Sequence, residues 1–429
     1  MSKALLVAIA VVALCLRLLN AVFIPWQGGD LVISDMKGYD RAAVALLQQQ
    51  PLAVHTAERY LFHPLGSDTY HPPGYYYFLA GVYAAFGHDY MAVRIVQACV
   101  GTVTCMLIYL MGKYVFSAGA GLLAAAFAAV YPPLVFYGSV LLSETLSTCL
   151  LAGGVCLLLR STQAHRRYGW ELAASGLMLG LAALTRSVLL VAVPVALLWH
   201  LIIGKRWPGW REAVVRVGIL FLPCALIITP ITLRNRQIHG EMVPISTNGG
   251  VNFFLGHGGS TAWKNQIRNI PPDYQEGDSL IGVSALTATQ EEALFYRLGW
   301  DYVRQHPVRT VLDIPAKLRS MYWDSDFWPA SDVQAHLLRT ADTLMWKLLV
   351  LPLSLASILI LRGRRFRQAA LICGLAFSSA TIPIVFWAQT RFRIPFVPLF
   401  ITLAAGAAFE IYSRFRGTGP SALGAILAA

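Results

Sequence analysis

The sequence predicts an all-α polytopic membrane protein. The prediction rests on three observations: composition, hydropathy and the placement of charges. Of the 429 residues, 56% are hydrophobic and only 13% are charged, whereas soluble domains carry about 25% charged residues. The mean hydropathy is +0.57. The 34 Lys and Arg residues outnumber the 22 Asp and Glu residues. They gather between apolar runs, a pattern that orients a chain in a bilayer and does not indicate nucleic-acid binding.

Ten apolar stretches reach the roughly 20 residues that a spanning helix needs. We expect spans at about 3–24, 91–112, 118–137, 141–160, 171–186, 188–203, 213–233, 344–361, 368–388 and 394–413. The first resembles a signal peptide without a clear cleavage site, so we interpret it as an uncleaved span. The stretch 75–88 is short and aromatic and predicts a juxtamembrane helix. The fold therefore has about 10–11 transmembrane helices.

Loop charges then orient the chain. With the N-terminus inside, every basic cluster between spans falls on the cytoplasmic side, and residues 25–90 and 234–343 face outward. We expect an N-terminal transmembrane module over 1–233, an extracytoplasmic loop domain over 234–343, and C-terminal spans over 344–429. In this loop domain, Thr289 and Glu292 fit a capping box that opens a helix through about Gln305, and 307–322 predicts a second amphipathic helix.

Five arginines at the outer ends of spans depart from this charge pattern. They are Arg186, Arg234, Arg236, Arg391 and Arg393. A guanidinium at this level costs free energy unless it is paired, and phosphate suits its planar fork. Lipid headgroups or loop carboxylates explain each arginine singly equally well, but the five together favour an anionic ligand.

Outward carboxylates and two turn-rich segments add further candidates. Asp35 follows the first span, and Glu144 lies about one turn inside a span, where a carboxylate predicts a functional site. Asp35 could also cap a helix, and for Asp40 we favour such a cap or a solvated charge. The remaining candidates lie in 71–77 (HPPGYYY) and in the glycine-rich 248–260, which could approach a ligand closely; a single histidine there is more often structural.

These segments resemble polytopic glycosyltransferases of the GT-C superfamily, in the group of protein O-mannosyltransferases and aminoarabinose lipid A transferases. The resemblance runs in family order through 34–47, 71–87, 93–98, 131–146, 229–256 and 391–400. It implies the GT-C fold and the transfer of a single sugar, with inversion, from a polyprenyl-phosphate donor of the undecaprenyl-phosphate type. The acceptor is a hydroxyl group of a glycan, lipid or protein at the extracytoplasmic face of the bacterial cytoplasmic membrane.

The resemblance also implies roles for individual residues. Asp35 corresponds to the general base, and Glu144 to a second acid that orients a substrate or, with Asp35, holds a divalent cation, Mg²⁺ or Mn²⁺. No other cofactor is expected. Arg391 and Arg393 correspond to the basic pair at the lipid phosphate, and by position we add Arg186 and Arg234. Expected substrate contacts are His71, Tyr75, Asn248, Asn252 and His257.

Two other classes of protein remain open from the sequence. A transporter or flippase of a phosphate-linked lipid sugar would use the same arginines, but it often has repeated halves, and no internal repeat is visible here. A membrane scaffold would need neither Asp35 nor Glu144.

Overall fold

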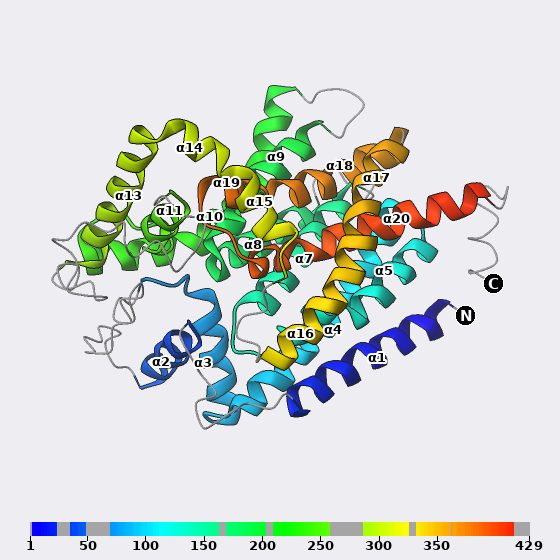
Figure 1. Ribbon diagram of the computed structural model, residues 1–429, viewed down its shortest axis with the longest axis horizontal. Helices are drawn as coiled ribbons and strands as arrows, with labels where there is room; N and C mark the ends of the chain where they lie inside the picture. Colours follow the sequence, from blue (N-terminus) through cyan, green and yellow to red (C-terminus); the bar gives the residue numbers. More distant parts are fainter. Residues whose placement is uncertain are drawn as a thin grey trace.

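The computed structural model describes residues 2–23, 35–48, 69–162, 169–202, 209–257, 286–325, 332–361 and 363–415. Every regular element within these ranges is a helix (Figure 1). Seven helices are long and apolar enough to cross a membrane, and three shorter apolar helices accompany them. These ten coincide one for one with the predicted spans. The all-α polytopic fold is therefore confirmed.

The elements of the N-terminal part alternate between long helices and short connecting ones. Its helices are α1 (Ser2–Phe23), α2 (Asp35–Leu47), α3 (Gly74–Phe86), α4 (Tyr90–Val115), α5 (Ala118–Val130), α6 (Pro132–Phe136), α7 (Glu144–Ser161), α8 (Trp170–Thr185), the 3₁₀ helix η1 (Ser187–Val191), α9 (Ala192–Ile202) and α10 (Trp210–His239).

The second part begins with short helices and returns to spanning ones. Its helices are α11 (Gly249–His257), α13 (Ala288–Gln305), α14 (Pro307–Leu312), α15 (Ile314–Tyr322), α16 (Asp332–Asp342), the π-helical η5 (Thr343–Val350), α17 (Leu351–Ile360), α18 (Gly363–Ser378), α19 (Thr381–Val385), the 3₁₀ helix η6 (Thr390–Phe396) and α20 (Val397–Phe415).

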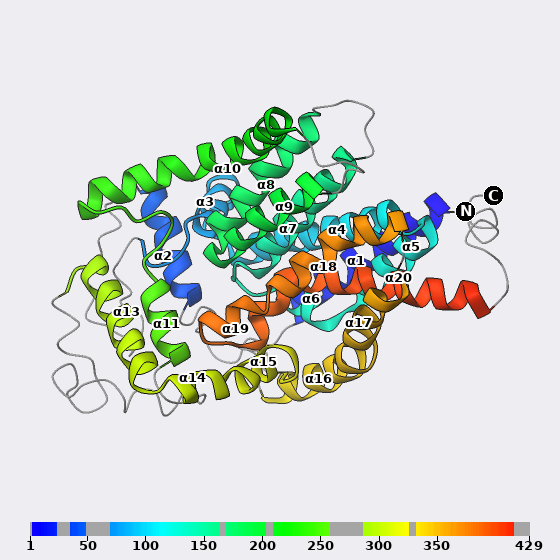
Figure 2. The same cartoon turned by 90° about the horizontal axis from the view of Figure 1, so that it is seen from above.

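The core of the bundle surrounds α20. This helix packs against α4, α5, α17 and α18, and its residues from Val397 to Ala407 are all buried (Figure 2). On the other side of α4, the helices α7, α8 and α10 pack in sequence against one another. Because each of these helices is apolar on most of its surface, the bundle is held by close packing in which a buried polar side chain needs a specific partner.

Helices from the two segments predicted to face outward, residues 25–90 and 234–343, gather at one end of the bundle. Figure 1 shows α2, α3, α11 and α13 at this end, whereas the first residues of α1 and the last residues of α20 lie at the opposite end. The loop before α11 joins the two segments, because Thr247 N donates to Thr69 O at 2.8 Å and His239 Nε2 lies 2.8 Å from Thr69 Oγ1. The two segments form one assembly over this end of the bundle.

Asp40 anchors helix α2 to the bundle. The sequence favoured a helix cap or a solvated charge for Asp40, and in the structure it is neither. Its Oδ1 accepts hydrogen bonds from Tyr83 at 2.6 Å and lies 2.8 Å from His88 Nε2, and its Oδ2 accepts one from Tyr90 at 3.1 Å. These partners come from α3, the following turn and α4. A single carboxylate therefore ties α2, which begins at Asp35, to the bundle.

The amphipathic helices of the second segment differ in detail from the prediction. The capping box of α13 is formed by Thr287 and Gln290, not by Thr289 and Glu292. The predicted helix over 307–322 is two helices, because Pro315 lacks an amide hydrogen and its ring displaces the preceding turn, so that α14 ends before α15 begins. The first difference frees Glu292 for another role.

Candidate active site

A cavity of about 880 Å³ lies at the end of the bundle where the two segments predicted to face outward meet. Its walls come from α2, the turn before α3, the N-terminus of α7, the C-terminus of α8, the loop before α11, α11 itself, α13, and the segment from α19 to η6. Four of the predicted charged residues line it: Asp35, Glu144, Arg186 and Arg391. The fold thus brings together charges from four distant parts of the sequence.

Asp35 is the first residue of α2 and forms an ion pair in this cavity. Arg391 Nη1 lies 2.9 Å from Asp35 Oδ2, and the side chains are 14% and 10% exposed, respectively. Such a partly buried, charge-assisted contact is stronger than a surface ion pair. Glu144 also acts electrostatically on Arg391, after Asp35. The arginine therefore lies in the field of both carboxylates.

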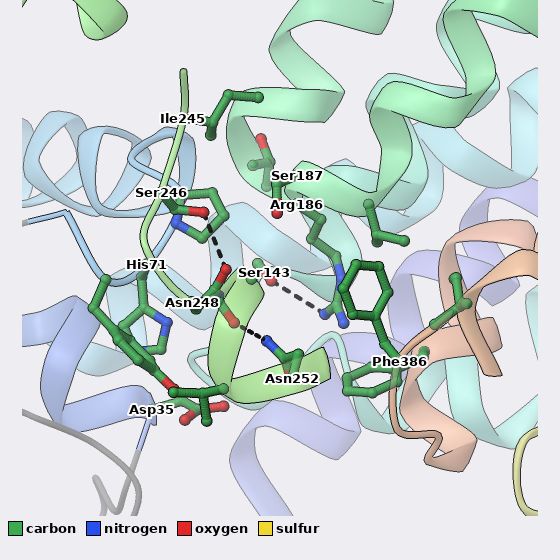
Figure 3. A pocket seen from close by; sticks show the side chains of 18 of the residues that line it. Asp35, His71, Ser143, Arg186, Ser187, Ile245, Ser246, Asn248, Asn252 and Phe386 are labelled. Atoms are coloured by element: carbon green, nitrogen blue, oxygen red, sulfur yellow. Dashed lines mark hydrogen bonds between the residues drawn. The ribbon is translucent and has the colours of Figure 1, made fainter. Parts of the chain in front are cut away.

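Glu144 forms the second ion pair of the cavity. Glu144 is the first residue of α7, where the partial positive charge of the helix N-terminus stabilises its carboxylate. Arg186 Nη1 donates to Glu144 Oε1 at 2.6 Å. It also donates to Ser143 Oγ at 3.3 Å (Figure 3). Glu144 is 1% exposed, and its Oε2 has no hydrogen-bond partner among the described residues. That buried oxygen keeps an unused hydrogen-bond acceptor site.

Tyr39 lies between the two ion pairs. Burial, and then the nearby Asp35 carboxylate, raise the pKa of its hydroxyl, which hydrogen-bonds the Ser143 side chain and is also in the field of Arg186. Tyr39 was not among the site residues predicted from the sequence. Its spacing of four from Asp35, which places both on one face of a helix, is the signal that could have found it.

His71 lines the cavity, whereas Tyr75 supports it from behind. The His71 ring lies 4.6 Å from the Tyr39 ring. Tyr75 is fully buried, donates to Gln97 Oε1 at 2.7 Å, and contacts the Tyr39 ring edge-on at 4.9 Å. The motif contains Gly74 at the start of α3 because a Cβ there would lie 2.7 Å from Thr185 Oγ1, so only glycine lets α3 start against the end of α8.

Asn248 and Asn252 line the cavity as one hydrogen-bonded unit. Ser246 Oγ donates to Asn248 Oδ1 at 3.1 Å, and Asn252 Nδ2 donates to Asn248 O at 2.7 Å (Figure 3). Trp387 Nε1 donates to Asn252 Oδ1 at 2.5 Å. These bonds hold the glycine-rich segment against the chain that leads into η6.

Arg393, predicted at the donor phosphate, does not line the cavity. It is fully buried and forms an ion pair with Asp342, which also accepts a hydrogen bond from Tyr131 at 2.6 Å. Its guanidinium lies 4.4 Å from the centre of the Trp346 ring. Arg393 lies only two residues from Arg391 in η6, but it is held in the core. Its charge is already compensated there by Asp342. The pair joins η6 to α16.

Arg234 and His257 also lie outside the cavity lining. Arg234 Nη1 donates to Asn235 Oδ1 at 3.4 Å, and Asn235 Nδ2 donates to Val243 O and Ile245 O, so this end of α10 secures the loop before α11. The His257 Nε2 atom lies 2.9 Å from Val385 O. Burial, reinforced by Lys317, lowers the pKa of His257 to about 4. Its imidazole is neutral and structural in this arrangement.

The donor set does not fit a divalent cation held by Asp35 and Glu144. Each carboxylate is paired with an arginine, and a divalent cation bound to both carboxylates would repel the two nearby guanidinium groups. Within the described residues, no three His, Cys, Asp or Glu side chains converge on a point that could hold a metal ion.

Comparisons with known proteins agree with this fold. Residues 70–232 match the family model of dolichyl-phosphate-mannose-protein mannosyltransferase. The curated proteins give no sequence match. Among solved structures, the chain is similar to the Archaeoglobus fulgidus oligosaccharyltransferase tethered with an acceptor peptide, with a TM-score of 0.58, 14% identity, and coverage of 97% of this chain and 50% of that chain.

Two further solved structures are similar. Archaeoglobus fulgidus AglB in complex with an inhibitory peptide and a dolichol-phosphate gives a TM-score of 0.57 at 15% identity, covering 100% of this chain and 54% of that chain. Cupriavidus metallidurans ArnT bound to undecaprenyl phosphate gives a TM-score of 0.44 at 12% identity, covering 97% of this chain and 79% of that chain. The chain spans about half the length of the archaeal enzymes.

The chain is a multi-pass membrane protein with the fold of these GT-C enzymes. The predicted resemblance to this superfamily is therefore confirmed.

Proposed function

We propose that this protein transfers a single sugar from a polyprenyl-phosphate donor to an acceptor hydroxyl, at the extracytoplasmic face of a bacterial cytoplasmic membrane. The observation that carries the proposal is the Asp35–Arg391 ion pair in a large cavity at one end of a spanning bundle. A carboxylate base and a phosphate-binding cation are the two groups that this reaction needs, and here they are in contact.

The surroundings of the two cavity arginines suit a lipid-linked phosphate. Apolar side chains of Val188, Leu190 and Phe386 line the same cavity as Arg186 and Arg391. A poorly solvated guanidinium stabilises the charge that develops on a departing phosphate better than one in water does. The dolichol-phosphate held by the similar archaeal enzyme supports a donor of this kind.

The proposed chemistry is a single inverting displacement. The acceptor oxygen forms a bond to the anomeric carbon as the bond from that carbon to the phosphate oxygen breaks, and the electron pair of that bond stays on the phosphate. Asp35 takes the acceptor proton, and because the departing phosphate is stable as an anion, no second acid is required to protonate it. Arg391 and Arg186 bind the phosphate, while the unpartnered Glu144 Oε2 orients a substrate hydroxyl.

The placement of the cavity supports the proposed orientation. It lies at the end of the bundle opposite the start of α1 and the end of α20, which is the extracytoplasmic end when the basic loops are cytoplasmic. Membrane lipids surround the bundle, and a glycan, lipid or protein supplies the acceptor hydroxyl.

Release of free polyprenyl phosphate from a panel of polyprenyl-phosphate monosaccharides tests the proposal. Wild type, Asp35→Asn and the exposed control Asp301→Asn would be compared in lipid nanodiscs, with crude envelope extract as acceptor source. We expect wild type and the control to release lipid phosphate from one donor and Asp35→Asn to lose about 10²–10⁴-fold in rate. Equal release by Asp35→Asn would remove Asp35 as base.

The same assay decides between this proposal and its alternatives. Release that is unchanged in EDTA would agree with carboxylate–arginine pairs that hold no metal ion. Release that is lost in EDTA and restored by Mg²⁺ or Mn²⁺ would show a metal-dependent site. Intact donor that crosses a vesicle bilayer without release from any donor would identify a flippase instead.

A further inference from the structure

One wall of the cavity differs chemically from the wall that carries the ion pairs. It is formed by α11 and α13, which pack through Val251, Phe254, Leu294 and Phe295. From α13, Glu292 and Tyr296 line the cavity one helical turn apart. We call this surface the α11–α13 wall. Neither residue was selected as a site residue from the sequence.

The Glu292 carboxylate is fixed by the backbone of α11. It accepts hydrogen bonds from the amides of Gly249 and Gly250, the first two residues of that helix. A Cβ on Gly249 would lie 3.0 Å from Glu292 Oε1 and collide with the Tyr296 hydroxyl, and one on Gly250 would collide with the Glu292 carbonyl oxygen. Two consecutive glycines are therefore required for this close approach.

The carboxylate is held without a cation. Among the described residues, Asp35 and Glu144 each pair with an arginine, but the interactions that act on Glu292 are burial and the two amides. Burial raises the pKa of Glu292 to about 7. A carboxylate kept in such a place costs stability, which is typical of a group retained for binding.

The remaining groups of this side of the cavity are uncharged and suit a sugar ring. Ser246, Asn248 and Asn252 supply hydroxyl and amide groups, and Trp387 supplies an aromatic ring. A few fixed polar groups set among aromatic side chains are the usual means of orienting a small polar ligand. Two amide hydrogen bonds use only part of the acceptor capacity of a carboxylate, which has about four lone-pair sites.

We infer that the α11–α13 wall is a sugar subsite, in which Glu292 accepts hydrogen bonds from hydroxyl groups of a sugar ring. The inference rests on the proposed function. The ring belongs either to the donor or to a glycan acceptor, because both present the same hydroxyl chemistry to the same cavity.

Binding and kinetic measurements on Glu292→Gln test this inference. Binding of polyprenyl phosphate without a sugar, and of the polyprenyl-phosphate monosaccharide that wild type cleaves, would be measured in nanodiscs, followed by KM for donor and for acceptor. The amide keeps the volume of the side chain but loses the charge that strengthens a bond to a hydroxyl. Asp301→Asn, on the exposed face of the same helix, is the charge-matched control.

We expect Glu292→Gln to bind plain polyprenyl phosphate as wild type does. Its Kd for the sugar-bearing donor, or its KM for the acceptor, should rise about tenfold or more, since a hydrogen bond to a charged group is lost. A rise in the donor Kd assigns the subsite to the donor sugar, and a rise confined to the acceptor KM assigns it to the acceptor.

The result that overturns the inference is a wild-type enzyme that releases lipid phosphate while Glu292→Gln keeps wild-type Kd and KM values. Failure of the proposed function would look different, because wild type itself would then release nothing. Melting curves of each variant distinguish lost recognition from lost folding, and Glu292→Asp, which keeps the charge on a shorter side chain, should recover part of the sugar affinity.

Discussion

Arg391 Nη1 and Asp35 Oδ2 lie 2.9 Å apart, although they come from opposite ends of the sequence. In the proposed reaction these two groups act on different atoms, since the arginine binds the phosphate and the carboxylate takes a proton. A donor phosphate that takes over Arg391 leaves the Asp35 carboxylate with less compensating charge and therefore more basic. Donor binding and base activation are in this way coupled by one ion pair.

Replacement of Arg391 tests this coupling. We expect Arg391→Gln to weaken binding of polyprenyl phosphate about tenfold or more, because a charge-assisted contact with phosphate is lost. Arg391→Lys should recover only part of the affinity, since an ammonium keeps the charge but not the planar fork. The measurement is the Kd for polyprenyl phosphate in nanodiscs, with the exposed Arg211→Gln as control. Unchanged affinity in Arg391→Gln would place the phosphate elsewhere.

The Glu144–Arg186 pair predicts a double-mutant cycle. Arg186→Gln alone leaves the nearly inaccessible Glu144 carboxylate without its cation, so we expect a loss of about 3–5 kcal/mol of stability, as for other buried pairs broken on one side. Glu144→Gln with Arg186→Gln should restore much of that stability but not the transfer rate. Thermal unfolding and release of polyprenyl phosphate measure the two effects. A loss of stability in the double variant equal to the sum of the losses in Arg186→Gln and Glu144→Gln would show that the residues do not interact.

Arg393 should behave unlike Arg391 although it is two residues away. We expect Arg393→Leu to lose about 3–5 kcal/mol of stability, because it leaves the Asp342 carboxylate buried without a cation. Arg393→Leu with Asp342→Asn should be more stable than Arg393→Leu alone. The protein that remains folded should bind polyprenyl phosphate with wild-type affinity. A stable Arg393→Leu variant that no longer binds the lipid phosphate would return Arg393 to the donor site.

The spans could be predicted because the signal for them is local. Apolar runs and the charges between them are read directly from the sequence, and the ten helices follow them. The four charged residues of the cavity could be selected for a related reason. A charge beside an apolar span is costly, so its presence indicates a specific role.

Partners distant in the sequence could not be predicted in the same way. Arg391 and Arg393 are the same residue type in the same motif. The ion pair with Asp342, contributed by α16, holds Arg393 in the core and away from the cavity. Glu292 was missed for a different reason. Both Thr287–Gln290 and Thr289–Glu292 fit a capping box, and which one forms depends on where the helix begins. The glycines that fix Glu292 precede it by more than forty positions.

The Glu292 carboxyl predicts a pH dependence of stability with a definite sign. Its pKa rises from 4.5 to about 7 on folding because of burial, so the folded state binds the proton more tightly. The resulting stabilisation is complete below the unfolded pKa and is lost as pH rises through about 7. Tyr296, the titratable neighbour that Glu292 affects, has its own pKa raised from 10.0 and stays neutral over this range.

The melting temperature of wild type should therefore fall relative to that of Glu292→Gln between pH 5 and pH 8. Because the carboxyl is only partly buried and water in the cavity screens it, we expect a relative change of about 1–3 °C. The Asp301→Asn control should follow wild type. A Glu292→Gln variant that melts below wild type at pH 8 would mean that the ionised carboxylate stabilises the fold through its amide contacts. The presence of Glu292 would then be explained without a ligand. A Glu292→Gln variant that is more stable than wild type but binds the sugar more weakly would show that Glu292 lowers stability in return for recognition.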